Sequence, residues 1–225
     1  MNTTKTLKSR LDFEEDDVPI GPTKVLPYAV QSHVRNTFMF KLDEPVAEPS
    51  YYRNIVDVCL QAKEDDEILF FLNTPGGLYS GLTTVLDAIL RTEATTVAVI
   101  QGECHSAGSI IALHCDLVDV SPYATMLAHS ISYGTGGKDA DIVAHVTHTT
   151  KQANSIVRET YEGFLTEQEI AQVLDGKQLY MDAEEIVVRL EARDEYREEI
   201  IKQRQAEAEL EQNPPKAKAR KTKQT

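Results

Sequence analysis

Ser106 and His129 are the side chains best placed by type and spacing to do covalent chemistry. Ser106 follows a β-rich run at residues 95–100 and precedes an apolar stretch at 110–113, which predicts that it lies where a strand turns into a helix. Unpaired N–H groups and the positive end of the helix dipole point to such a position, which suits a nucleophilic hydroxyl. His129 ends the next predicted strand, where it is available as the base.

Each of these two residues also has a simpler interpretation. Ser is a preferred N-cap, so Ser106 taken alone is equally compatible with a helix cap. A His between Ala128 and Ser130 at a strand end is often a hydrogen-bonded structural residue.

A glycine-rich break favours the catalytic interpretation. The segment Asn73-Thr74-Pro75-Gly76-Gly77 interrupts an apolar strand at 69–72 before a helical pattern at 78–91. Paired glycines there let a backbone amide face a ligand closely. The sequence therefore supplies a nucleophile, a base and a flexible backbone donor in three separate segments.

The order and spacing of these motifs resemble the proteolytic subunit of the Clp protease, within the Clp and crotonase superfamily, which includes divergent viral members. The resemblance covers residues 36–189 and includes the segment 137–142, which looks like the start of the long handle helix of that family. It implies an α/β fold, a spiral of repeated ββα and βα units with a protruding handle helix.

The resemblance also assigns roles. Ser106 attacks a peptide carbonyl, and His129 takes the proton and later returns it to the leaving amine. The backbone amides of Gly77 and Ala107 hold the oxyanion. No cofactor and no metal are implied.

The third member of the triad is where the chain departs from the family pattern. The family carries an Asp at the position that corresponds to Gln178, and a neutral side chain there can orient an imidazole but cannot stabilise its charged form. Asp175 is the alternative partner if the loop differs. Lys177 replaces an Arg that relatives use between rings, so single rings are as compatible with the sequence as double ones.

Alternating periodicities predict the elements that position these residues. Strands are expected at 37–42, 68–72, 95–100, 117–120 and 125–128, and helices at 51–63, 78–91, from Ser106 and at 139–164. A further long helix is expected at 183–212, which is dense in Glu, Arg, Ala and Ile and has few helix breakers. Repeated βα units predict right-handed crossovers and a mostly parallel sheet. In the helix at 51–63, one apolar face is expected to carry Ile55, Val56, Cys59 and Leu60.

The ends of the chain differ in composition from its middle. We expect a flexible acidic, Pro-containing arm at 1–35, a catalytic domain at 36–190, a charged helix at 191–213 and a disordered basic tail at 214–225. The 225 residues are 41% hydrophobic, enough for one sizeable core. The chain has no apolar run of membrane-spanning length and no apolar signal region at its start, which predicts a cytoplasmic protein without a membrane partner. A net charge of −13 argues against nucleic acid as a partner.

Rival chemistries rest on cysteine and histidine. Cys104, His105, His114 and Cys115 suggest a zinc site, but adjacent ligands do not follow the usual spacing. Cys104 is a weaker candidate nucleophile than Ser106. His145 and His148 lie three apart on one helical face, a pattern more typical of a solvated stripe than of a metal site.

The sequence thus predicts a serine endopeptidase that cleaves unfolded or threaded polypeptides. The segment Gly134-Thr135-Gly136-Gly137 lacks the ending of a phosphate loop, so an ATP-driven unfoldase, if used, is a separate partner. A homo-oligomeric ring, by family resemblance a heptamer, is expected. The alternatives are a pseudoprotease that serves as a ring scaffold or adaptor, and a processing protease of the viral head-maturation type.

Overall fold

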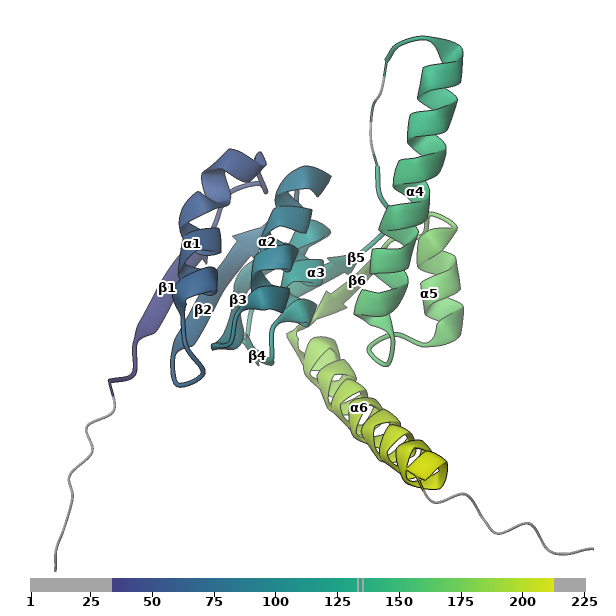
Figure 1. Ribbon diagram of the computed structural model, residues 1–225. Helices are drawn as coiled ribbons and strands as arrows, with labels where there is room; N and C mark the ends of the chain where they lie inside the picture. The colour runs from purple at the N-terminus through teal and green to yellow at the C-terminus, as the bar shows by residue number, and fades with distance from the viewer. Residues whose placement is uncertain (1–33, 133, 135, 213–225) are drawn as a thin grey trace, which may run out of the picture. The chain divides into compact units, whose positions relative to one another are not determined.

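The computed structural model describes residues 34–132, 134 and 136–212 (Figure 1). The elements in chain order are β1 (Thr37–Leu42), the 3-10 helix η1 (Pro49–Tyr52), α1 (Arg53–Gln61), β2 (Glu67–Thr74), α2 (Tyr79–Arg91), β3 (Thr95–His105), α3 (Ala107–His114), β4 (Leu117–Val120), β5 (Thr125–Ala128), α4 (Asp139–Tyr161), α5 (Glu167–Leu174), β6 (Leu179–Asp182) and α6 (Ala183–Gln212). Most of the proposed N-terminal arm and the basic tail lie outside the described residues. No helix within the described ranges is long and apolar enough to cross a membrane.

The sheet has six strands in the described part of the chain, in the order β1-β2-β3-β5-β6, with β4 also paired to β3. All pairs are parallel except β5 with β6. Side chains alternate along β2, where Ile68, Phe70 and Leu72 are fully buried. Figure 1 shows α1, α2 and α3 on one face of the sheet. The predicted α/β class and mostly parallel sheet are confirmed.

Strand β3 runs five residues beyond the predicted end and so reaches the turn at Ser106. The strand is not interrupted at Gln101-Gly102, because Gly102 has no side chain and so leaves room for the side chain of Asn73. A Cβ on Gly102 would lie 2.4 Å from Oδ1 of Asn73, and the same oxygen accepts a hydrogen bond from the N–H of Glu103 at 3.0 Å. The strand therefore continues past Gly102 at a local irregularity in its pairing with β2.

The predicted helix at 51–63 is shorter, because a 3-10 turn, η1, replaces its beginning. Ile55 and Cys59 are buried as expected, and Val56 packs against the core. The expectation for Leu60 is wrong, since its side chain is 59% exposed. The buried face of α1 is therefore narrower than its apolar sequence pattern suggests.

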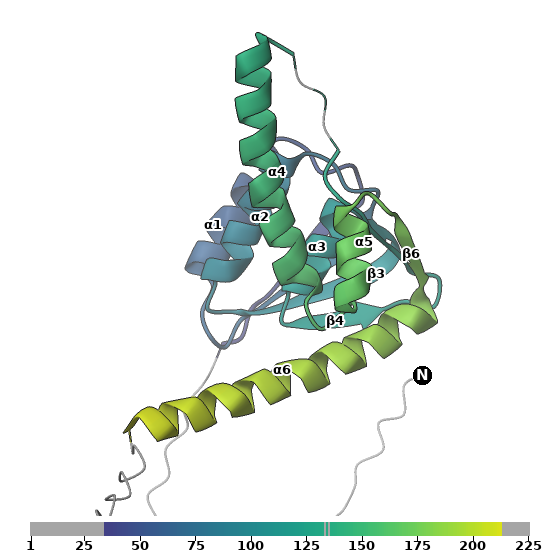
Figure 2. The same ribbon diagram turned by 90° about the vertical axis from the view of Figure 1, so that its right-hand side faces the viewer.

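Helix α4 projects from the rest of the described fold (Figures 1 and 2). Its buried residues, Ala153, Val157, Thr160 and Tyr161, all lie in its C-terminal half. The helix ends at Tyr161, three residues before the predicted end, because Gly163 adopts a φ of +78°. A Cβ on Gly163 would meet the ring of Tyr196 at 2.6 Å, so this turn needs a glycine.

The two elements between α4 and α6 are absent from the sequence prediction. Helix α5 starts with a capping box in which Thr166 and Glu169 bond reciprocally. The short strand β6 follows and passes directly into α6. The predicted bounds of the long charged helix at 183–212 are confirmed.

Candidate active site

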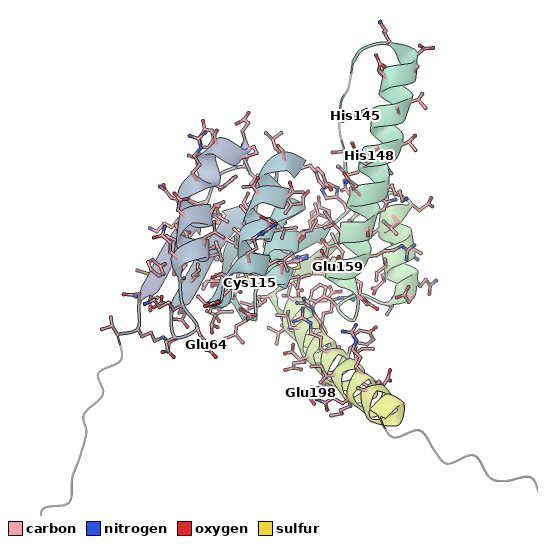
Figure 3. The ribbon with its side chains drawn as sticks, viewed as in Figure 1. Glu64, Cys115, His145, His148, Glu159 and Glu198 are labelled. Carbon is pink, nitrogen blue, oxygen red and sulfur yellow. The ribbon has the colours of Figure 1, made fainter. Side chains whose placement is uncertain are left out.

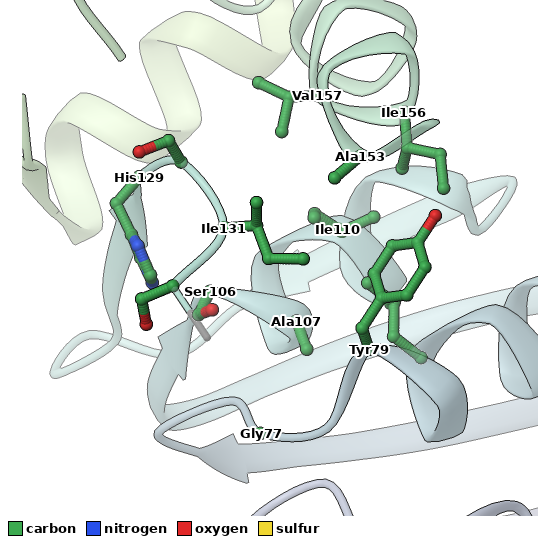
Figure 4. A pocket seen from close by; sticks show the side chains of 13 residues that line it. Gly77, Tyr79, Ser106, Ala107, Ile110, His129, Ile131, Ala153, Ile156 and Val157 are labelled. Carbon is green, nitrogen blue, oxygen red and sulfur yellow. The ribbon is translucent and has the colours of Figure 1, made fainter. Parts of the chain in front are cut away.

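Ser106 and His129 line one cavity of about 70 Å³ (Figure 4). Both side chains are half-buried. The cavity is completed by the residues Gly77, Tyr79, Leu82, Ala107, Ile110, Ser130, Ile131, Ser132, Ala153, Ile156 and Val157. The residues that the sequence singles out for nucleophile, base and oxyanion binding thus all border the same space.

Ser106 occupies the sharp turn between β3 and α3, with φ 55° and ψ −118°. It is the one non-glycine residue with a positive φ in the described part of the chain. Such a conformation costs about 1–3 kcal/mol and persists only where the surroundings enforce it. Ser106 is the N-cap residue of α3, yet its side chain makes no capping hydrogen bond. The hydroxyl is therefore not used as a cap and faces the cavity.

The turn at Gly76 packs directly against Ser106. A Cβ on Gly76 would lie 2.6 Å from the Cβ of Ser106 and 2.8 Å from the carbonyl oxygen of His105. The buried Thr74 holds this turn, because its Oγ1 donates to the carbonyl of Glu44 at 2.7 Å and accepts from the N–H of Gly76 at 3.2 Å. The glycine at this position thus permits a backbone contact that any side chain would block.

The backbone N–H of Gly77 points away from Val46. The Val46 N–H donates to the carbonyl of Gly76 at 2.8 Å, and the Leu78 N–H donates to the carbonyl of Val46 at 2.7 Å. In an extended segment these two groups point one way, so the N–H of the intervening Gly77 points the other way. No hydrogen bond between described residues engages this N–H.

Ala107 is the first residue of α3, so its N–H has no partner within the helix. Ala107 and Gly77 border the cavity together with Ser106. Two backbone donors at one cavity are the arrangement that stabilises an oxyanion formed beside the Ser106 hydroxyl.

His129 follows directly after β5, which pairs antiparallel with β6 through Ala128 and Leu179. Extending that register by one residue brings His129 opposite Gln178, the position at which the sequence comparison lacks a carboxylate. Asp175 caps the end of α5 and is exposed, and Gly176 turns the chain between it and β6 with a φ of +98°. No hydrogen bond between described residues joins His129 to Ser106, Gln178 or Asp175.

Lys177 donates through Nζ to Oε1 of Gln172 at 2.8 Å. This contact stays within the α5 region, and both Lys177 and Gln178 are exposed. The structure thus gathers Ser106, His129, Gly77 and Ala107 at one cavity, places Gln178 next to His129 by register, and leaves Asp175 and Lys177 on the surface.

The apolar wall of the cavity is not anticipated by the sequence analysis. Ala153, Ile156 and Val157 of α4 form one side of it, and Tyr79 of α2 borders it with its ring. Partial burial raises the pKa of the Tyr79 hydroxyl, so this group is neutral at ordinary pH. The spacing of the three α4 residues marks a buried helix face, but nothing in the sequence ties that face to Ser106.

The rival cysteine and histidine chemistry finds little support. Cys104 and Cys115 are buried free thiols; burial raises the pKa of both, to about 12 for Cys115. A buried neutral thiol is a poor nucleophile. His105 hydrogen-bonds Oγ1 of Thr125 through Nε2, and His114 bonds the carbonyl of Ile110 through Nδ1. Among the described residues, no three His, Cys, Asp or Glu side chains are grouped as metal ligands.

His145 and His148 lie on the projecting half of α4 (Figure 3). Both side chains are exposed. Their three-residue spacing therefore corresponds to the solvated stripe that the sequence favours.

Comparison with known proteins gives two findings. The family model for Clp protease matches residues 28–189. The membrane protein NfeD1b of Bacillus subtilis (strain 168) is 35% identical over 71 residues, which is 32% of this chain. The matched segment spans only 16% of that relative.

Proposed function

Because the chain belongs to the Clp protease family, we propose that it is a serine endopeptidase that cleaves unfolded or threaded polypeptides. The observation that carries this proposal is the strained turn at Ser106, which presents an uncapped hydroxyl to a cavity shared with His129. A strained strand-to-helix turn also presents the nucleophilic serine of α/β-hydrolases.

The reaction follows from this placement. Oγ of Ser106 attacks the peptide carbonyl carbon while an imidazole nitrogen of His129 takes its proton. The N–H groups of Gly77 and Ala107 hold the negative oxygen of the tetrahedral intermediate. The C–N bond then breaks as His129 returns the proton to the leaving amine, and water hydrolyses the acyl-enzyme by the same steps.

The cavity beside Ser106 favours an apolar substrate side chain before the cut bond. Its walls carry Ile110, Ile131 and Ile156, and no Asp, Glu, Lys or Arg side chain of the described residues borders it. Burying an apolar side chain there contributes about 25 cal/mol per Å² of surface removed from water.

A fluorophosphonate probe tests the proposed nucleophile. It should label the wild type and fail on Ser106→Ala, because the probe reacts with an activated serine. Cys104→Ala should retain labelling and serves as the matched control, two residues before Ser106 in β3. Labelling that survives Ser106→Ala would overturn the assignment.

We further propose that the active form is a homo-oligomeric ring, by family expectation a heptamer, that works in the cytoplasm with or without an ATP-driven unfoldase. Mass photometry at micromolar concentration should find the ring. Monomers alone would contradict this part of the proposal.

The neutral Gln178 favours a second candidate, a ring scaffold or adaptor that has lost peptidase activity. Assembled rings without any fluorophosphonate labelling would select it. A processing protease of the head-maturation type would share the nucleophile and differ in acting without an unfoldase.

A further inference from the structure

A buried pair of hydroxyl groups lies directly behind the proposed nucleophile. Oγ of Ser109 is 2.6 Å from the hydroxyl oxygen of Tyr161, 2.7 Å from the carbonyl oxygen of Ser106 and 3.1 Å from the carbonyl oxygen of Leu127. Ser109 and Tyr161 are both fully buried. Neither side chain is among the residues that border the cavity.

The hydrogen-bond directions follow from counting protons. Ser109 has one proton and two carbonyl acceptors, whereas the hydroxyl of Tyr161 has no acceptor other than Ser109 among the described residues. Tyr161 therefore donates to Ser109, and Ser109 donates to Ser106, the nearer carbonyl, with Leu127 as the second acceptor. Burial raises the pKa of Tyr161, which keeps its proton in place.

This chain of hydrogen bonds reaches both catalytic segments. The carbonyl of Leu127 also accepts the N–H of Ser106 at 2.9 Å, and Leu127 lies two residues before His129. The Ser109 hydroxyl thus touches the backbone of the strained turn and the backbone of the strand that carries the base. A serine that only bonded back within its own helix would contact Ser106 alone.

We propose that Ser109 and Tyr161 are positioning residues that hold the Ser106 turn in register with the His129 strand. The inference rests on the proposed function, because it concerns the rate at which Ser106 reacts. The strained backbone of Ser106 needs such support, since a misplacement of about 1 Å costs up to about 100-fold in rate.

Saturation kinetics with the fluorophosphonate probe test the proposal on Ser109→Ala and Tyr161→Phe in the full chain. Each variant should lower the limiting labelling rate constant, by about tenfold or more for Ser109→Ala and about fivefold for Tyr161→Phe. The half-saturating probe concentration and the final labelling stoichiometry should stay at the wild-type values. In the double variant, the labelling rate constant should fall by less than the product of the two single-variant falls, because both residues act through one chain of hydrogen bonds.

Thr160→Val is the matched control. Thr160 is equally buried in the same helical turn, but its hydroxyl has no hydrogen-bond partner among the described residues. Removing this hydroxyl should leave the labelling rate constant within about twofold of wild type, as expected for a group that makes no hydrogen bond.

The outcomes separate this inference from the proposed function. An unlabelled wild type overturns the proposed function and the inference with it. Labelling of wild type and both variants at one rate overturns only the inference. A fall in the final labelling stoichiometry at an unchanged labelling rate constant would assign Ser109 and Tyr161 a purely structural role and would also overturn the inference. If Ser109→Ala does not fold, Tyr161→Phe still tests the inference.

Discussion

Gly76 lies so close to Ser106 that a Cβ added to Gly76 would stand 2.6 Å from the Cβ of Ser106. Its φ of +90° is also one that other residues rarely adopt. The geometry of Ser106, the proposed nucleophile, therefore depends on the absence of a single methyl group on another loop.

Gly76→Ala should abolish fluorophosphonate labelling and lower the free energy of unfolding by roughly 1–3 kcal/mol, because the methyl group must displace Ser106 or its own loop. Urea unfolding and labelling measure the two effects. Gly136→Ala is the control, since a Cβ there meets nothing within 4 Å. Wild-type labelling of Gly76→Ala would refute the described packing.

Gln178→Asp should raise the rate of peptide hydrolysis by at least about tenfold, because a carboxylate opposite His129 stabilises the charged imidazole. In the serine triad, replacing the charged partner by a neutral one lowers kcat by about 10⁴. The register of β5 and β6 supports this position. Steady-state cleavage of a fluorogenic peptide gives the rate, and Gln178→Asn is the neutral control. If Asp175→Asn lowers the rate while Gln178→Asp does nothing, Asp175 is the partner instead.

Ala153→Leu should fill the cavity beside Ser106 with a larger side chain. For peptides with a large apolar side chain before the cut bond, kcat/KM should fall by about tenfold, which corresponds to a loss of about 1.4 kcal/mol of binding free energy. Labelling by a fluorophosphonate with a small alkyl group should persist. Ala144→Leu, on the exposed half of α4, is the matched control. Equal effects of the two variants would place the substrate elsewhere.

The ion pair of Glu169 with Arg189 should make stability depend on pH in the acid range. Bidentate hydrogen bonds from Arg189, at 2.8 and 3.0 Å, lower the pKa of the Glu169 carboxyl from 4.5 to about 2. The stabilisation is therefore complete above pH ~4.5 and is lost as the pH falls through about 2. Arg189→Gln should lower the unfolding free energy by about 2 kcal/mol at pH 6.

This difference between wild type and Arg189→Gln should shrink toward zero near pH 2, as measured by urea unfolding across the range. Arg91→Gln is the control, because its pair with Asp87 is exposed and contributes little. A difference that stays constant from pH 6 to pH 2 would contradict the role of the Glu169 charge.

Much of the fold follows from local sequence patterns, and the limits of that inference are physical. Local apolar patterns predict the bounds of β1, β4 and β5. The bounds of α6 follow from a composition rich in Glu, Arg and Ala with few helix breakers. The extension of β3 depends on Asn73 filling the space beside Gly102, a contact between strands that no local pattern encodes. Helix α5 has a readable signal in its Thr166 capping box. Strand β6 passes directly into α6, so no helix breaker or turn residue separates the two in the sequence.

The candidate site likewise contains residues that local sequence patterns predict and residues that only the tertiary fold brings together. Ser106, His129 and Gly77 lie in motifs at element ends, where sequence spacing is informative. The Tyr161 hydroxyl reaches Ser109 from a helix 52 positions away, so only the tertiary fold brings the two together. The apolar wall supplied by Ala153 and Val157 arises from the same long-range packing.

Strand β5 lies between β3 and β6, and the segment that ends in His129 is therefore flanked on one side by residues 179–182. During synthesis, the N-terminal βα units emerge from the ribosome well before this last strand. The strand that carries His129, the proposed base, therefore gains its pairing with β6 only after residue 182 has been made. If the proposed peptidase activity depends on His129, a nascent chain would acquire that activity only after residues 179–182 have been made.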